Sequence, residues 1–170
     1  MAADKYLYNN AGVLTEKSAT QSSAGAADAG KIPALDDSGR LANSMMPVGI
    51  GADTAAITAS ENLAAGDFVN IYNDTGTAKV RKADASTAGK YAHGFVLDAV
   101  TSGNPATVYF EGPNTQVSGV TPGEVFLSAT TPGGFTSAAP TGAGKVVQKI
   151  GVATAATNIN FEWLQPIVLA

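Results

Sequence analysis

Two glycine-led strand openings recur at one fixed spacing in the C-terminal two-thirds of the chain. The first reads Gly66-Asp67-Phe68-Val69-Asn70-Ile71 and the second reads Gly123-Glu124-Val125-Phe126-Leu127, so each places a turn glycine and an acid before an apolar run. Gly123 follows Gly66 by 57 residues, and Gly151, which opens another apolar run, follows Gly94 by the same 57. Equal spacings indicate one β-unit used twice, and two copies suit a double-unit barrel or sandwich because a solenoid needs at least three. Chance recurrence in a glycine-rich chain is the alternative.

Turn signals also favour an all-β fold. From about Asp53 onward, clusters such as Asn73-Asp74-Thr75-Gly76 and Ser102-Gly103-Asn104-Pro105 separate short apolar runs at intervals of about eight to twelve residues, which is typical of sandwiches and barrels. Charged residues make up only 14% of the chain, which argues against a helical bundle with charged outer faces. We therefore expect residues 53–170 to form a small all-β barrel or sandwich domain with its own core.

The first 52 residues differ in composition, and we expect them to form an extended N-terminal arm. Residues 18–31 are small and polar, so they cannot bury enough apolar surface to offset an ordering entropy of roughly 1–2 kcal/mol per residue. A partner surface is the simplest candidate for ordering them, and covering the chain's own barrel is the alternative. Asn9, Asn10 and Gly12 predict a turn or small hairpin, which is marginal in water unless it packs on something else. The candidate partner-binding residues of the arm are its larger apolar and aromatic side chains: Tyr6, Leu7, Tyr8, Val13, Leu14, Ile32, Leu35, Leu41, Met45 and Met46.

Residues that carry catalytic or metal chemistry are scarce. His93 is the single histidine and there is no cysteine, so no set of His and Cys ligands completes a transition-metal site. We interpret His93 as structural, and Asp36-Asp37-Ser38-Gly39 as a turn, because the latter lacks the alternating ligands and terminal Glu of a calcium loop. Residues 141–145 read as a hairpin turn, since Val146 stands where a phosphate loop needs Ser or Thr. We therefore predict a protein that is not an enzyme and uses no cofactor and no metal.

Charge and hydropathy narrow the classes of partner. The net charge of −4 lacks the basic footprint that nucleic-acid binding needs. No window approaches the length of an apolar membrane span, and residues 1–6 lack the basic and apolar regions of a signal peptide, so we expect no membrane partner. Trp163, Phe161 and Tyr109 suit either a ligand platform or packing in a core or subunit interface, and packing is the interpretation we favour.

Two parts of the chain resemble proteins of tailed bacteriophages. Residues 30–41 (GKIPALDDSGRL), running on to Ser44-Met45-Met46-Pro47, resemble a segment common in structural proteins of these phages, including tail-fibre and head-fibre proteins. Residues 66–170 resemble the small head decoration proteins, also called cement proteins. The recognisable pieces of this second block are Pro122-Gly123-Glu124-Val125-Phe126-Leu127-Ser128, Pro132-Gly133-Gly134, Ala139-Pro140 and Val147-Gln148-Lys149-Ile150-Gly151-Val152-Ala153.

This resemblance implies a viral structural protein of the virion. Such a protein is made in the host cytoplasm, sits on the outer capsid surface and stabilises the capsid by bridging neighbouring subunits of the major capsid protein, often as a homo-oligomer, either a trimer or a dimer. A β-domain without reactive sites and with an adhesive arm suits that role, because a ligand that binds only the assembled lattice stabilises it by mass action. The alternative is a phage fibre or a receptor- or carbohydrate-binding module, although the chain lacks the long repetitive shaft of a fibre.

Overall fold

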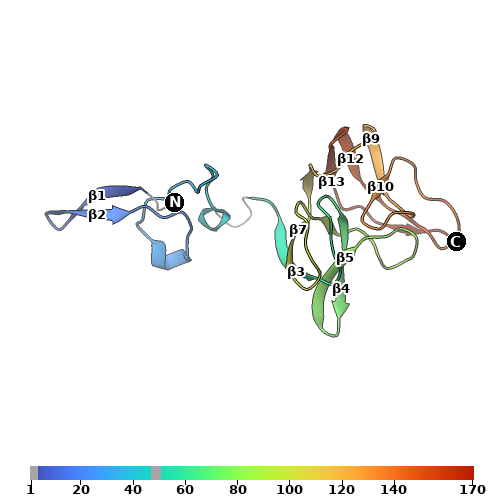
Figure 1. Ribbon diagram of the computed structural model, residues 1–170, viewed down its shortest axis with the longest axis horizontal. Helices are drawn as coiled ribbons and strands as arrows, with labels where there is room; N and C mark the ends of the chain where they lie inside the picture. Colours follow the sequence, from blue (N-terminus) through green and yellow to red (C-terminus); the bar gives the residue numbers. More distant parts are fainter. Residues whose placement is uncertain (1–3, 47–50) are drawn as a thin grey trace. The chain divides into compact units, whose positions relative to one another are not determined.

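The computed structural model of the chain describes residues 4–46 and 51–170 (Figure 1). The chain divides into two units, Met1–Gly51 and Ala52–Ala170, and this division lies beside the expected one between residues 52 and 53. The regular elements of the described residues are strands apart from two short 3-10 turns, so the predicted all-β class is confirmed.

The N-terminal unit begins with an antiparallel hairpin of β1 (Lys5–Asn10) and β2 (Val13–Ser18). Ala11 and Gly12 form its two-residue turn, and both have positive φ, at 51° and 93°. Two positive φ values give the turn a twist that matches the twist of the flanking strands. The Gly12 N–H also donates a hydrogen bond of 2.7 Å to the Asn9 side-chain oxygen, which holds the turn closed. The hairpin predicted from these residues is therefore present.

Polar contacts order the remainder of the N-terminal unit. It contains two 3-10 turns, η1 (Gly25–Asp28) and η2 (Asn43–Met45), and neither turn has a buried residue. The Ser23 N–H donates a hydrogen bond of 2.9 Å to Ser44 Oγ, which joins two stretches far apart in sequence. Residues 18–31, for which we expected an outside surface to be needed, thus take their conformation from hydrogen bonds within the unit.

The body, Ala52–Ala170, contains a closed five-stranded barrel and an open five-stranded sheet (Figure 1). The barrel follows the order β3-β5-β4-β6-β7, and β3 closes it by pairing antiparallel with β7 and parallel with β5. The open sheet follows the order β10-β9-β12-β13-β8, and a further short pair joins β11 to β14. The strand bounds are β3 (Thr54–Ala59), β4 (Phe68–Asp74), β5 (Thr77–Lys82), β6 (Gly94–Phe95), β7 (Pro105–Tyr109), β8 (Gly112–Asn114), β9 (Gly123–Leu127), β10 (Phe135–Thr136), β11 (Val146–Val147), β12 (Lys149–Ala155), β13 (Asn158–Phe161) and β14 (Ile167–Val168).

The barrel and the open sheet repeat one strand order, as the glycine spacing predicts. Neighbours β5-β4-β6-β7-β3 in the barrel correspond to β10-β9-β12-β13-β8 in the sheet. Gly94 on β6 pairs with β4, and Gly151 on β12 pairs with the corresponding strand β9. Both positions need glycine, because an added Cβ would lie 2.4 Å from the carbonyl oxygen of Tyr109 and 2.0 Å from that of Asn160. The residues that reveal the repeat therefore mark equivalent close approaches of two strands.

The first copy of the β-unit closes into a barrel, whereas the second remains an open sheet. Residues of the first copy lie against both ends of that sheet. At the β10 end, the Phe68 N–H donates a hydrogen bond of 2.9 Å to the carbonyl oxygen of Gly133. At the β8 end, the buried Asn114 amide donates a hydrogen bond of 2.9 Å to the carbonyl oxygen of Gly66. The Phe68 ring also packs against Phe161 on β13. One core cluster therefore spans both copies, while a second, smaller cluster fills the barrel.

Candidate functional site

The single histidine has the contacts of a structural residue. His93 Nδ1 accepts a hydrogen bond of 3.0 Å from the Ile71 N–H, and the His93 N–H donates one of 2.8 Å to the Val69 carbonyl oxygen, so the residue ties β4 to the segment before β6. Burial lowers the pKa of His93, which keeps the imidazole neutral at pH 7. Within residues 4–46 and 51–170, no group of three or more His, Cys, Asp or Glu side chains is placed to hold a metal ion. No helix in those ranges has the length and apolar character of a membrane span.

The three aromatic residues considered as a ligand platform do not share one exposed surface. Phe161 is only 1% exposed, and its ring packs 5.8 Å from Phe95. Tyr109 stacks on Phe95 at 5.4 Å between ring centroids, so it belongs to the same packed cluster. Trp163 is the exposed member, at 47%. Core packing is therefore confirmed for Phe161 and Tyr109, and Trp163 remains available at the surface.

The N-terminal unit exposes apolar side chains of the kind that a folded domain buries. No residue among 4–46 is buried, whereas the buried hydrophobic residues of the described chain all lie in the body, between Ala59 and Phe161. The half-buried members of the ten candidate binding residues are Tyr6, Tyr8 and Met45. The other seven are exposed: Leu14 (72%), Leu7 (70%), Val13 (66%), Leu35 (54%), Ile32 (50%), Leu41 (44%) and Met46 (38%).

The hairpin carries exposed apolar residues on both faces. The register places Leu7 and Leu14 on one face, diagonally across the two strands, where side chains of this length can touch a common partner. Val13 and Tyr8 lie on the other face, where Lys17 Nζ sits 5.2 Å from the centre of the Tyr8 ring. A two-stranded hairpin without a packed face is marginal in water. The exposed leucines therefore make this hairpin a candidate contact surface.

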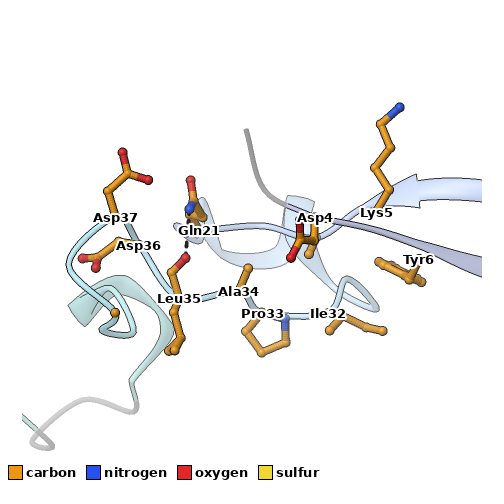
Figure 2. Close-up of a pocket in the computed structure, with 12 residues that line it drawn as sticks. Asp4, Lys5, Tyr6, Gln21, Ile32, Pro33, Ala34, Leu35, Asp36 and Asp37 are labelled. Carbon is orange, nitrogen blue, oxygen red and sulfur yellow. Dashed lines mark hydrogen bonds between the residues drawn. The ribbon is translucent and has the colours of Figure 1, made fainter. Parts of the chain in front are cut away.

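A groove of about 650 Å³ lies within the N-terminal unit (Figure 2). Its apolar wall is formed by Ile32, Pro33 and Leu35, whose side chains lie along one side of an extended segment, together with Tyr6 from β1. Tyr6, Ile32 and Leu35 are thus the candidate binding residues that the fold brings together here. The candidates that do not line the groove are Leu7, Tyr8, Val13, Leu14, Leu41, Met45 and Met46.

Hydrogen bonds hold the extended segment that forms the groove wall. The Thr20 N–H donates to the carbonyl oxygen of Ile32 at 3.0 Å, and the Ala34 N–H donates back to the Thr20 carbonyl oxygen at 2.7 Å. Gln21 Nε2 adds a hydrogen bond of 2.8 Å to the carbonyl oxygen of Leu35, drawn as the dashed line in Figure 2. These bonds leave the Ile32 and Leu35 side chains exposed, so the wall is formed before any ligand arrives.

Three aspartates at the groove were not among the predicted binding residues. Asp36 and Asp37 lie toward one end and Asp4 toward the other (Figure 2). Asp36 belongs to the predicted turn, where its carboxylate accepts hydrogen bonds from Ser38 Oγ at 2.6 Å and from the Arg40 N–H at 3.0 Å. The Ser38 hydroxyl and then the Arg40 N–H lower the pKa of Asp36, which keeps this carboxylate ionised at neutral pH. The sequence signal for Asp36 and Asp37 was present, but it indicated a turn and not a groove.

The one basic residue at the groove is engaged on the hairpin. Lys5 Nζ forms an ion pair of 2.5 Å with Glu16 Oε1 on β2, and Figure 2 shows the lysine side chain directed away from Ile32 and Pro33. The charged residues that line the groove are therefore predominantly acidic. Comparison with known proteins adds no relative: no protein-family model, no curated protein and no solved structure matches the chain.

Proposed function

We propose that the chain is a non-enzymatic structural protein of a tailed-phage virion. In this role it decorates the outer capsid surface and stabilises the shell by bridging neighbouring subunits of the major capsid protein. The observation that carries the proposal is the contrast between the two units: residues 4–46 bury no side chain, while the body has two packed core clusters. In this proposal the N-terminal unit gains its apolar burial on the capsid surface.

The size of the gain supports a binding role for the N-terminal unit. Full burial of a leucine side chain contributes about 1.5–3 kcal/mol. Leu7 and Leu14 are each at least 70% exposed, so a partner that covers this face of the hairpin recovers most of that amount for both residues. Part of this burial free energy offsets the entropy that is lost when the bound segment becomes ordered. Because the protein binds the assembled lattice and not its separated subunits, the remainder stabilises the shell by mass action.

Self-association, as a trimer or a dimer, is part of the proposal. The C-terminal part of the body exposes Ile167 at 61%, Val168 at 47% and Trp163 at 47%. Ile167 and Val168 form β14, which pairs in the described chain with the two-residue strand β11, so β14 is a short edge strand. Exposed apolar edge strands favour pairing with another chain.

Co-sedimentation with purified phage capsids tests the proposed function. We expect the wild-type protein to sediment with capsids, and we expect the double variant Leu7→Ser/Leu14→Ser to bind at least about tenfold more weakly, since 1.4 kcal/mol of lost burial corresponds to that factor. Val152→Ser is the control, because Val152 is an exposed apolar residue, at 43%, that belongs to the body and not to the hairpin. Wild-type protein that stays in the supernatant, or a double variant that binds as tightly as wild type, contradicts the proposal.

A second candidate function is a fibre or carbohydrate-binding module. Trp163 supports it, because an exposed tryptophan offers a flat apolar face of the kind that stacks on a sugar ring. A glycan array probed with wild type and with Trp163→Ala separates the two functions. Binding to a glycan that disappears in Trp163→Ala favours the module, and an array without binding argues against it.

A further inference from the structure

We infer that the groove of the N-terminal unit binds an extended protein segment in which aliphatic side chains are flanked by lysine or arginine. The apolar part of this inference comes from the wall of the groove. Ile32 and Leu35 are 50% and 54% exposed, and they lie side by side with Pro33 on a segment that hydrogen bonds already hold extended (Figure 2). Only the source of this bound segment, the major capsid protein, is taken from the proposed function.

The open wall of the groove favours a chain segment over a small molecule. A volume of about 650 Å³ suits either a small ligand or several side chains of a segment, so the exposure of the wall decides between them. Sites for small ligands enclose most of the ligand surface. Here the wall residues Ile32 and Leu35 remain half exposed, so a small molecule would stay largely in water. An extended segment covers such an open surface with successive side chains and gains affinity from its length.

The charges at the groove determine which segment fits. Asp4, Asp36 and Asp37 flank the apolar wall, and the lysine beside them, Lys5, is paired with Glu16. A cationic flank is therefore attracted and an anionic flank repelled, which sets both the orientation and the rate of encounter.

A second copy of this chain suits the groove less well. The protein has a net charge of −4, so two copies repel each other at long range. The most basic strand is β5, and its aliphatic residue Val80 is fully buried in the barrel. Lys79 of the same strand is already paired with Asp74. Strand β5 of a second copy therefore offers no such segment, and Leu41 beside Arg40 is the exposed match in this chain that the sedimentation test below addresses.

Fluorescence anisotropy with the full-length protein and three synthetic peptides tests the inference. The peptides share a Val-Leu-Val core and differ only in their flanking residues, which are lysine, glutamine or glutamate. We expect the lysine peptide to bind at least about tenfold more tightly than the glutamate peptide, with the glutamine peptide between them. Equal affinity for all three peptides, or no measurable binding of any, overturns the inference.

Point variants locate the binding in the groove. Leu35→Ser should weaken binding of the lysine and glutamine peptides, whereas Val152→Ser, at an exposed position of the body that does not line the groove, should leave it unchanged. Asp4→Asn should reduce the preference for lysine over glutamate, whereas Asp98→Asn makes the same change in net charge on the body and should not. A lysine preference that survives Asp4→Asn and Leu35→Ser unchanged overturns the assignment to this groove.

Two further results separate this inference from the proposed function. Peptide binding without capsid binding leaves the groove assignment standing and contradicts the capsid role. Capsid binding that is insensitive to Leu35→Ser, together with no peptide binding, leaves the capsid role standing and contradicts the groove assignment. Sedimentation velocity tests whether a second copy of the chain occupies the groove. If Leu35→Ser converts an oligomer into monomers and no peptide binds, a second copy fills the groove and the inference is wrong.

Discussion

Phe68 and Phe161 pack with their ring centroids 5.8 Å apart, and each comes from a different copy of the repeated β-unit. Phe68 begins β4 in the barrel and Phe161 ends β13 in the open sheet, and both side chains are almost completely buried. Phe95 on β6 lies 5.8 Å from Phe161 and joins the same cluster. The larger core of the body is thus shared between the copies, so the copies depend on each other for stability.

Phe161→Ala should destabilise the whole body by about 3–5 kcal/mol, because it removes a large buried side chain and leaves a cavity between the two copies. Urea unfolding followed by tryptophan fluorescence and by circular dichroism measures this change. Val152→Ala, at an exposed position on neighbouring β12, should change the free energy of unfolding by less than about 1 kcal/mol. Two separate transitions in the wild-type body would contradict the shared core.

Gly94→Ala should destabilise the body by about 1–3 kcal/mol, the usual cost of forcing extra atoms into a packed site. An added Cβ would lie 2.4 Å from the Tyr109 carbonyl oxygen and 2.7 Å from Val108 Cγ1, so β6 and β7 would have to separate. Gly103→Ala is the control for glycine replacement itself. Gly103 has a φ of +88° but nothing within 4 Å of an added Cβ, so its expected cost of about 1 kcal/mol is conformational strain alone.

Gly94→Ala is destabilised by a steric clash between strands and Gly103→Ala by local backbone strain, so hydrogen exchange should distinguish the two variants. In Gly94→Ala, hydrogen exchange should accelerate at the amides of β6 and β7, since the new methyl group pushes these strands apart. In Gly103→Ala, faster exchange should remain local to the turn at Gly103, which follows β6 and precedes β7. A Gly94→Ala protein with wild-type stability would show that the strand approach is not as close as the structure has it.

Local sequence patterns predict the repeated β-unit well, but they do not predict the strand pairing that closes the barrel. Gly94 and Gly151 are visible in the sequence because close strand approach restricts each position to one residue type. The β4–β5 hairpin is predictable from its turn residues, since Gly76 has positive φ and its N–H donates a hydrogen bond of 2.7 Å to the Asn73 side-chain oxygen. The parallel pairing of β3 with β5, which closes the barrel, leaves no such mark. It depends on backbone bonds between distant segments, and the side chains of β3 are mostly alanine and threonine.

The groove of the N-terminal unit also depends on contacts between distant segments that the sequence does not reveal. Its apolar residues were predicted singly as contact residues, because exposed Ile32 and Leu35 stand out in a small polar segment. Their meeting with Tyr6 depends on backbone hydrogen bonds between Thr20 and the strand-like segment around Pro33, and these bonds have no side-chain signature. Asp4 was missed because an isolated acid near the start of a chain indicates nothing by itself.

Stability should fall as the pH drops below about 6.5, and His93 should account for part of the loss. Burial lowers the pKa of His93 in the folded state, so the unfolded state takes up the proton first as the pH falls. Between the unfolded and folded pKa values the unfolded state binds more protons, and the free energy of unfolding therefore decreases toward acid and levels off below the folded pKa. A protonated Nδ1 also cannot accept the hydrogen bond from the Ile71 N–H.

Chemical denaturation of wild type and His93→Asn at several pH values measures this contribution. Asparagine keeps a side-chain oxygen that accepts the Ile71 N–H but does not titrate. The difference in unfolding free energy between the two proteins should be constant above about pH 7 and should shift in favour of the variant toward about pH 5. Carboxylates such as Asp28 and Asp36 titrate in both proteins and cancel in this difference. A pH-independent difference would show that His93 has the same pKa in both states.

In the free protein, amides of the β1–β2 hairpin should exchange at least about a hundredfold faster than those of the β4–β5 hairpin, as measured by hydrogen–deuterium exchange. Both hairpins are antiparallel and are closed by two-residue turns with positive φ, so they differ mainly in burial. Val69 and Val80 of β4–β5 are fully buried in the barrel core, whereas β1 and β2 have no buried residue. Binding to a partner should raise protection in β1–β2 and leave β4–β5 unchanged, because only the former gains a packed face. Equal protection of the two hairpins in the free protein would mean that the N-terminal unit is stable alone, and the exposed leucines would then no longer argue for a partner.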